Sequence, residues 1–296
     1  MDILELDDIS EIQEGHFVIN EFIAKTVRIM KNSDIQIRLP EHRPVEFGQT
    51  TTVSIVGSDR FCQTKLADNL IFHVMVFFSL LDSLIDSKYP NLEGFSFVQK
   101  YRELPSNDDN ELIIKEIFRI LRIFRNAITH SKSAITVTDN IFVNYPRGNT
   151  QFNLQLNKTS LELIYSVILL VLDDNGYAEQ YLHGLMRTYY DDLKSGIIAI
   201  SDDFGQNNLA NVSDGFRLKR IVRYKLTNPE YNLDDSTDVI SIISSYPIPP
   251  YAIHHYSSDY LIELGGKKYL VPHEVLNTDG TIMLSEIMPW ELDDVV

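Results

Sequence analysis

The chain has 296 residues, of which 44% are hydrophobic and 23% are charged, a composition typical of folded globular proteins and unlike that of disordered ones. Its formal net charge of −16 disfavours non-specific binding to duplex nucleic acid, for which a basic face normally supplies most of the affinity. The single cysteine, Cys62, has no partner for an internal disulfide. The first residues are acidic where a secretory signal needs a basic flank, so we expect a soluble, cytoplasmic protein with no membrane association.

The first 130 residues are dominated by apolar side chains at helical spacing. This pattern covers residues 15–30, residues 111–130 and residues 66–84, where the apolar stripe is wide enough for the most buried helix of the fold. Residues 33–58 instead alternate and contain prolines, which predicts an irregular insertion with one or two short strands. We therefore expect a helical bundle interrupted by a β insertion.

The apolar period then changes from helical to alternating. Residues 135–156 alternate around a turn at residues 146–149, a pattern that predicts a β-hairpin. A capping pattern at Thr159 predicts the start of another helix. We expect this helix to break near residues 175–176 and to resume over 177–200.

Residues 202–215 are polar and contain glycines, which predicts a linker or long loop. Beyond it, strands are predicted within residues 216–226, 239–243, 259–264 and 268–271, the last two joined by a Gly265-Gly266 turn. The predicted fold class is α+β: a mainly α-helical bundle with a small β insertion, followed by a small β-rich domain. The expected domains are residues 1–201 and 216–296, on either side of the linker.

The motif best suited to chemistry lies at the end of the helix predicted over residues 111–130. The chain there reads Arg125-Asn126-Ala127-Ile128-Thr129-His130. This segment resembles the motif of the HEPN superfamily (higher eukaryotes and prokaryotes nucleotide-binding domain), in which an arginine precedes a histidine by four to six intervening residues, often with a polar residue directly after the arginine. The resemblance covers these six residues, and the helical pattern extends it loosely to about residue 200.

Helix geometry places these three polar side chains differently around the axis. Asn126 and His130 are four positions apart and share one face. Arg125 lies about 140° from His130 on a regular helix, so its long side chain or a second subunit must bring the two groups together. The last turn of a helix favours the protonated form of an imidazole such as that of His130.

These residue types suit RNA cleavage by attack of a 2′-hydroxyl on the adjacent phosphorus. His130 would transfer protons, Arg125 would bind the phosphoryl oxygens and Asn126 would orient them. This scheme requires no metal and no cofactor. The resemblance implies the same metal-independent endoribonuclease activity, with two motifs meeting across a homodimer. A toxin or phage-defence effector of this kind would also have an antitoxin or regulatory protein as a partner.

The same residues have a purely structural explanation. Arg125 would then be a solvated helix residue, and Asn126 and His130 would cap the end of the helix. The corresponding functional alternative is a catalytically inactive HEPN-like binding or assembly protein. The acidic chain and the separate β-rich domain favour this alternative, because acidic proteins often bind basic partners.

A second candidate is the dense basic segment over residues 217–225. If this segment is a strand, one face carries the cationic side chains of Arg217, Lys219, Arg223 and Lys225. Such a stripe predicts an RNA-binding surface that contacts phosphates. The alternative is a solvated strand face that pairs with nearby acidic residues.

Histidines in the last 50 residues suggest a metal site only weakly. The candidates are His254, His255, His273 and the adjacent Glu274. Neighbouring side chains on a strand point to opposite sides, and no Cys or HExxH pattern accompanies them. We therefore predict no metal site.

Overall fold

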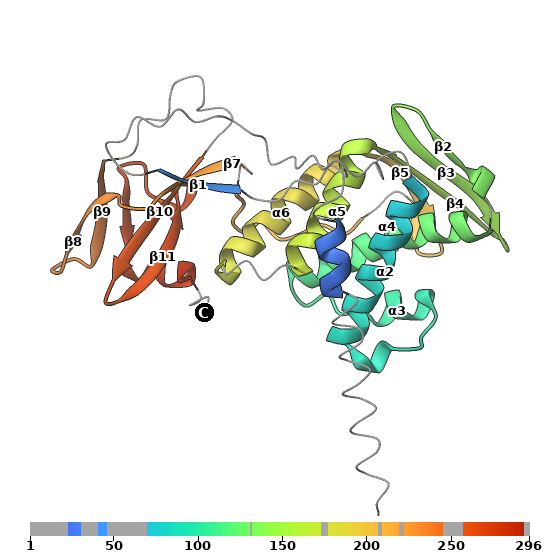
Figure 1. Ribbon diagram of the computed structural model, residues 1–296, viewed down its shortest axis with the longest axis horizontal. Helices are drawn as coiled ribbons and strands as arrows, with labels where there is room; N and C mark the ends of the chain where they lie inside the picture. The colour runs from blue at the N-terminus through green and yellow to red at the C-terminus, as the bar shows by residue number, and fades with distance from the viewer. Residues whose placement is uncertain are drawn as a thin grey trace, which may run out of the picture. The chain divides into compact units, whose positions relative to one another are not determined.

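The computed structural model describes residues 23–30, 41–45, 70–130, 132–172, 177–206, 209–218, 222–244 and 257–292. Both helices and strands are present, which confirms the predicted α+β class (Figure 1). The chain forms two compact units. Unit 1 comprises residues 1–37, 60–173 and 190–212, and unit 2 comprises residues 38–59, 174–189 and 213–296. This division differs from the expected domains, since residues 38–59 and 174–189 group with the C-terminal part.

Unit 1 contains most of the helices. Residues 23–30 are helical, and the others are α2 (Leu70–Lys88), α3 (Phe97–Glu103), α4 (Asp109–His130), α5 (Lys158–Leu172) and the end of α6 (Glu179–Ser195). Helix α2 packs against α4 and α5 and α3 packs against α4, so α4 lies at the centre of this arrangement. Solvent does not reach Phe77, Ile117 or Phe124 in this core. The helix predicted over residues 111–130 is thus confirmed, and the one predicted over residues 66–84 is confirmed from Leu70 onward, where the described residues begin.

Helix α2 is long and apolar enough to cross a membrane by length and composition, a test that the core helix of a soluble protein also passes. It nevertheless carries two carboxylates, Asp82 and Asp86, which both bind the buried Lys100 ammonium, Asp82 at 2.7 Å and Asp86 at 2.5 Å. Burial alone would lower the pKa of Lys100, but the hydrogen bonds from its ammonium to the two carboxylates raise it. This ion-pair cluster fixes α3 on α2.

A five-stranded antiparallel sheet completes unit 1, in the order β2-β3-β4-β5-β6. Its strands are β2 (Ile135–Val137), β3 (Asn140–Arg147), β4 (Thr150–Asn157), β5 (Ile197–Asp202) and β6 (Gly205–Gln206). The predicted hairpin is confirmed: β3 and β4 pair up to Arg147 and Thr150, and Gly148 takes the positive φ of 60° that the turn requires. Strands β3 and β4 both contact α4 (Figure 1).

Strand β5 corrects two predictions. The helix expected over residues 177–200 ends at Ser195, because the residues that follow pair with β4 as an antiparallel strand. The expected linker over 202–215 also begins too early, since Asp202 ends β5 and Gly205–Gln206 pair back with it. Residues 209–218 have no regular structure.

Unit 2 contains two further sheets. One has the order β1-β7-β10-β11, with β1 (Glu41–Val45), β7 (Val222–Leu226), β10 (Ser257–Leu264) and β11 (Lys267–Pro272). The other has the order β12-β9-β8, with β8 (Glu230–Asp234), β9 (Val239–Ser244) and β12 (Thr281–Met283), followed by α7 (Leu284–Ile287). The predicted β10–β11 hairpin is confirmed, and both turn glycines have positive φ.

Short 3₁₀ helices connect several of these elements: η1 (Pro90–Leu92), η2 (Lys132–Ala134), η3 (His273–Val275) and η4 (Met288–Trp290). Of the insertion predicted over residues 33–58, only β1 falls within the described part of the chain. The start of the helix predicted from residue 15, the break predicted near residues 175–176, Cys62, Lys219, His254 and His255 lie outside the described residues.

Candidate functional site

Three arginines occupy successive turns of α4: Arg119, Arg122 and Arg125. Residues three apart on a helix are neighbours, so the three arginines follow one another along α4. Arg119 and Arg122 are buried, with 4% and 0% of their side chains exposed, whereas Arg125 is half-buried. Buried arginines require acidic partners, because an unpaired cation is costly to remove from water.

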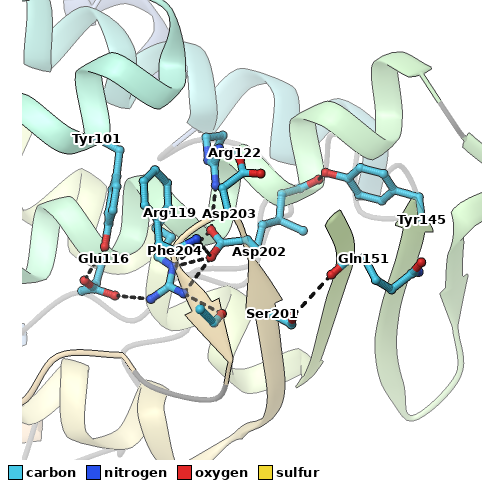
Figure 2. A network of polar contacts seen from close by, with 12 residues as sticks. Tyr101, Glu116, Arg119, Arg122, Tyr145, Gln151, Ser201, Asp202, Asp203 and Phe204 are labelled. Atoms are coloured by element: carbon cyan, nitrogen blue, oxygen red, sulfur yellow. Dashed lines mark hydrogen bonds and ion pairs between the residues drawn. The ribbon is translucent and has the colours of Figure 1, made fainter. Parts of the chain in front are cut away.

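Asp202, at the end of β5, is the main acidic partner (Figure 2). Its carboxylate accepts hydrogen bonds from Nε and Nη2 of Arg119, the latter at 2.8 Å, and from Nη2 of Arg122 at 2.6 Å. The backbone N–H of Phe204 donates to the same carboxylate at 3.0 Å. Asp203 accepts a second hydrogen bond from Arg122, at 3.0 Å. The tight β5–β6 turn thus holds two arginines of α4 in fixed positions.

Aromatic and acidic side chains surround this pair of arginines. The Phe204 ring lies under the Arg122 guanidinium, with 4.9 Å between Cζ and the ring centroid. Glu116 accepts a hydrogen bond from the Tyr101 hydroxyl at 2.9 Å and lies 3.6 Å from Arg119 (Figure 2). Burial raises the pKa of Glu116, and the hydrogen bond from Tyr101 and the charge of Arg119 only partly offset it.

A pocket of about 250 Å³ opens beside this network. Its lining comes from three places: the residues around the start of α3, the second half of α4 and the end of β3. The lining residues are Phe95, Ser96, Phe97, Val98, Arg122, Arg125, Asn126 and Arg147. Three of the eight are arginines and none is acidic. The pocket is therefore a cationic cavity within a strongly acidic chain.

Arg125 and Asn126, both predicted as catalytic, line this pocket. The Arg125 guanidinium lies over the Phe97 ring, with its Cζ 4.9 Å from the centroid, and Nη1 donates to Asn126 Oδ1 at 3.4 Å. Asn126 is buried, and the Tyr145 hydroxyl donates to the carbonyl oxygen of Ile123 at 3.2 Å. Burial raises the pKa of Tyr145 to about 12, so this hydroxyl stays protonated at neutral pH.

The third predicted catalytic residue, His130, lies elsewhere. It is the last residue of α4, its side chain is exposed, and it is not among the residues that line the pocket. The structure thus brings Arg125 and Asn126 together and leaves His130 one helical turn beyond them. Sequence reasoning also missed Arg122 and Arg147 as pocket residues, although the three-residue spacing of arginines in α4 was a visible signal.

The basic stripe predicted in unit 2 is not formed as expected. Strand β7 begins at Val222, so Arg217 lies in the irregular segment before it, and Lys219 falls outside the described residues. Arg223 is 1% exposed and therefore does not face solvent. Its prediction as an RNA-binding residue is wrong, because the side chain is buried within unit 2 and forms ion pairs with Asp259 and Glu274. Lys225, on the same strand, is half-buried.

Arg223 is the centre of a buried ion-pair network within unit 2. It binds Asp259 through Nε and through Nη2 at 2.7 Å, and it binds Glu274 through Nη1 at 2.8 Å and Nη2 at 2.5 Å. The Tyr181 hydroxyl donates to Asp259 at 2.9 Å. Burial would raise the pKa of Glu274, but the hydrogen bonds from Arg223 hold it below its usual range. The network joins β7, β10 and η3 and is structural.

The remaining histidine of the metal candidates has another partner. His273 Nδ1 lies 3.0 Å from the hydroxyl of Tyr260, and the adjacent Glu274 is committed to Arg223. Within the described ranges, no group of three or more His, Cys, Asp or Glu side chains could hold a metal ion. Comparison with known proteins adds no assignment, since no family model, no curated protein and no solved structure matches the chain.

Proposed function

We propose that unit 1 is a HEPN-like helical bundle and that the C-terminal end of α4 carries a metal-independent endoribonuclease site. The observation that supports this proposal most is the position of Arg125 and Asn126 in a pocket without acidic lining residues, in a chain of net charge −16. A phosphodiester is attracted to such a pocket even though the protein as a whole repels it. The exposed His130 lies on the same helix face as Asn126, one turn further on.

Each residue has a distinct role in the proposed reaction. The 2′-hydroxyl of the RNA attacks the adjacent phosphorus, the bond from phosphorus to the 5′-oxygen breaks, and the products are a 2′,3′-cyclic phosphate and a 5′-hydroxyl. Arg125 binds the phosphoryl oxygens as their charge increases. Asn126 positions Arg125 through the hydrogen bond to Oδ1. His130 transfers protons as a general acid or base, the role that histidine most often has in such reactions.

One imidazole cannot both remove the proton from the 2′-hydroxyl and donate one to the leaving 5′-oxygen in the same step. Two copies of the chain would supply two His130 side chains. A second copy would also remove the difficulty that Arg125 and His130 lie about 140° apart around one helix. We therefore propose a homodimer, acting in the cytoplasm as a toxin or phage-defence effector under the control of an antitoxin or regulatory protein.

A second candidate function is an RNA-binding or assembly module without cleavage. The position of His130 outside the pocket lining favours it. In this case the pocket would bind phosphate, and α4 would end in an exposed imidazole without a catalytic role. The half-buried Lys225 and Arg217 of unit 2 remain candidate RNA contacts under either function.

The two candidates are separated by incubating the purified protein with total RNA in EDTA. We expect cleavage by the wild type and by His183→Ala, a matched variant that removes an imidazole from α6 instead of α4. We expect His130→Ala to lose at least about 100-fold in rate, the usual contribution of a general acid or base. Since His130 is exposed, its replacement should leave the thermal unfolding midpoint unchanged. Full cleavage by His130→Ala would contradict the assignment, and no cleavage by any protein would favour the binding module.

A further inference from the structure

Two of the three arginines in the pocket have no carboxylate partner within the described part of the chain. Arg122 is neutralised by Asp202 and Asp203. For Arg125 and Arg147, by contrast, the structure shows no ion pair within 4.0 Å among the residues that it describes. Burial raises the pKa of Asp82, an effect that Lys100 and, more weakly, the charge of Arg125 oppose, and the Asp82 carboxylate is bound to Lys100. The pocket therefore presents two guanidinium groups without a carboxylate partner in the described part of the chain, the half-buried Arg125 and the exposed Arg147.

Arg122 adds a fixed donor to these two charges. Its side chain is fully buried, and its Nε has no hydrogen-bond partner among the described residues. A buried donor that is left unsatisfied is costly, and in native proteins such a group commonly marks a place where a ligand or a water molecule completes the hydrogen bonding. The carboxylates of Asp202 and Asp203 hold Arg122, one of the residues that line the pocket, in place before any ligand binds.

The size of the pocket restricts what can bind. At about 250 Å³ it is smaller than the roughly 300–1,000 Å³ of sites that enclose drug-sized ligands. One phosphate group and the sugar next to it fit this volume better than a whole nucleotide does. The apolar part of the lining, from Phe95 and Val98, suits the carbon atoms of a sugar, and Phe95 is 42% exposed at the rim.

Charge then distinguishes the two kinds of phosphate that RNA offers. An internal phosphodiester carries one negative charge, whereas a terminal phosphate monoester carries about 1.5 to 2 at neutral pH and has three acceptor oxygens. Two uncompensated guanidinium groups match the dianion. Arginine also binds phosphate oxygens in a bidentate manner, so Arg125 and Arg147 can together engage all three terminal oxygens.

We propose that the pocket formed by Arg122, Arg125, Arg147 and Asn126 binds the terminal phosphate monoester of an RNA strand. This inference rests on the proposed function for its RNA ligand, and it assigns Arg147, which lies outside the HEPN-like motif, as a residue that selects the substrate end. Arg147 comes from the end of β3 beside the hairpin turn, so the hairpin adds a second guanidinium without a carboxylate partner to the one that α4 provides. The same phosphate chemistry occurs in free mononucleotides, which the experiment includes.

The test measures binding and not cleavage. His130→Ala protein is titrated calorimetrically with one short single-stranded RNA in three forms: 5′-phosphorylated, 3′-phosphorylated and with hydroxyl groups at both ends. We expect one of the two phosphorylated forms to bind about tenfold or more tightly than the hydroxyl form, as one additional charge-assisted interaction provides. Adding Arg147→Gln should remove this preference. Arg28→Gln, an exposed arginine that does not line the pocket, is the matched control and should retain it.

Each outcome decides the inference separately from the proposed function. Equal affinity for all three RNAs, or an undiminished preference in the Arg147→Gln protein, would overturn the terminal-phosphate pocket even if the wild type cleaves RNA. A preference that depends on Arg147 would support it even if no cleavage is found. A mononucleotide that binds as tightly as the phosphorylated RNA would identify the free nucleotide as the ligand and would overturn the assignment to an RNA end.

Discussion

Asp202 offers the most stringent test of how the α4 arginines are held. The substitution Asp202→Asn keeps the shape of the side chain but removes the charge that Arg119 and Arg122 share. All three side chains are 4% exposed or less, so solvent cannot compensate for the loss. Removing one partner of a buried ion pair typically costs about 3–5 kcal/mol. Because Asp203 and Glu116 still offer partial partners, we expect a loss near the lower end, about 3 kcal/mol.

The loss can be read from urea denaturation. With an m-value of about 2 kcal/mol per molar urea, the midpoint should fall by about 1.5 M. Circular dichroism follows the helices, while the fluorescence of Trp290, the only tryptophan, monitors unit 2. Asp203→Asn is the matched control, since Asp203 is 29% exposed and, among the described residues, forms an ion pair with Arg122 alone, and it should cost about 1 kcal/mol or less. Equal effects of the two substitutions would refute the argument that burial makes Asp202 the main partner.

Two further predictions concern packing and pH. In Gly196→Ala the new Cβ would lie 2.5 Å from Asn157 Nδ2 and closer still to Ser160 Oγ. We therefore expect the free energy of unfolding to fall by about 1–3 kcal/mol, measured by thermal denaturation. An unchanged unfolding midpoint would contradict this close packing around Gly196. Glu274 has a lowered pKa when folded, so its stabilising interaction with Arg223 is fully present above its ordinary pKa of 4.5 and is lost as the pH falls through the folded value. The stability difference between wild type and Glu274→Gln should therefore be largest at neutral pH and shrink below about pH 4.5, and a constant difference across a pH series would refute this role of Glu274.

Local patterns were sufficient to predict much of the fold. The hairpins followed from turn glycines between alternating segments, and Gly148 and Gly265 do take the positive φ values that such turns need. The core helices α2 and α4 followed from apolar side chains at a period that only a helix can bury on one side. These features depend on residues that are close together in the sequence, so a short segment is enough to predict each of them.

The errors lie where distant segments decide the structure. Residues 197–200 follow a helix directly and are predicted from the sequence as its continuation, but pairing with β4 makes the segment Ile197–Asp202 a strand. Asp202 then becomes the buried partner of arginines 80 or more residues away, a role that no local pattern reveals. Arg223 was expected on a solvated face for a similar reason, since the buried Asp259 and Glu274 that bind it come from far along the chain.

The candidate site shows the same division between local and distant information. Arg125 and Asn126 could be found because they form a short motif, and the structure places both in one pocket. Arg147 could not, because only the packing of β3 and β4 against α4 brings the end of a hairpin to that motif.

We propose that the end of α4 promotes attack of an RNA 2′-hydroxyl on the adjacent phosphorus. The chemical identity of the product ends tests this proposal most directly. RNA labelled at one end is incubated with the wild-type protein in EDTA, and the new termini are identified by mass spectrometry. The account predicts 2′,3′-cyclic phosphates and 5′-hydroxyls, with neither formed by His130→Ala. Products that carry 3′-hydroxyls and 5′-phosphates would contradict it, because those ends require attack by water and not by the 2′-hydroxyl.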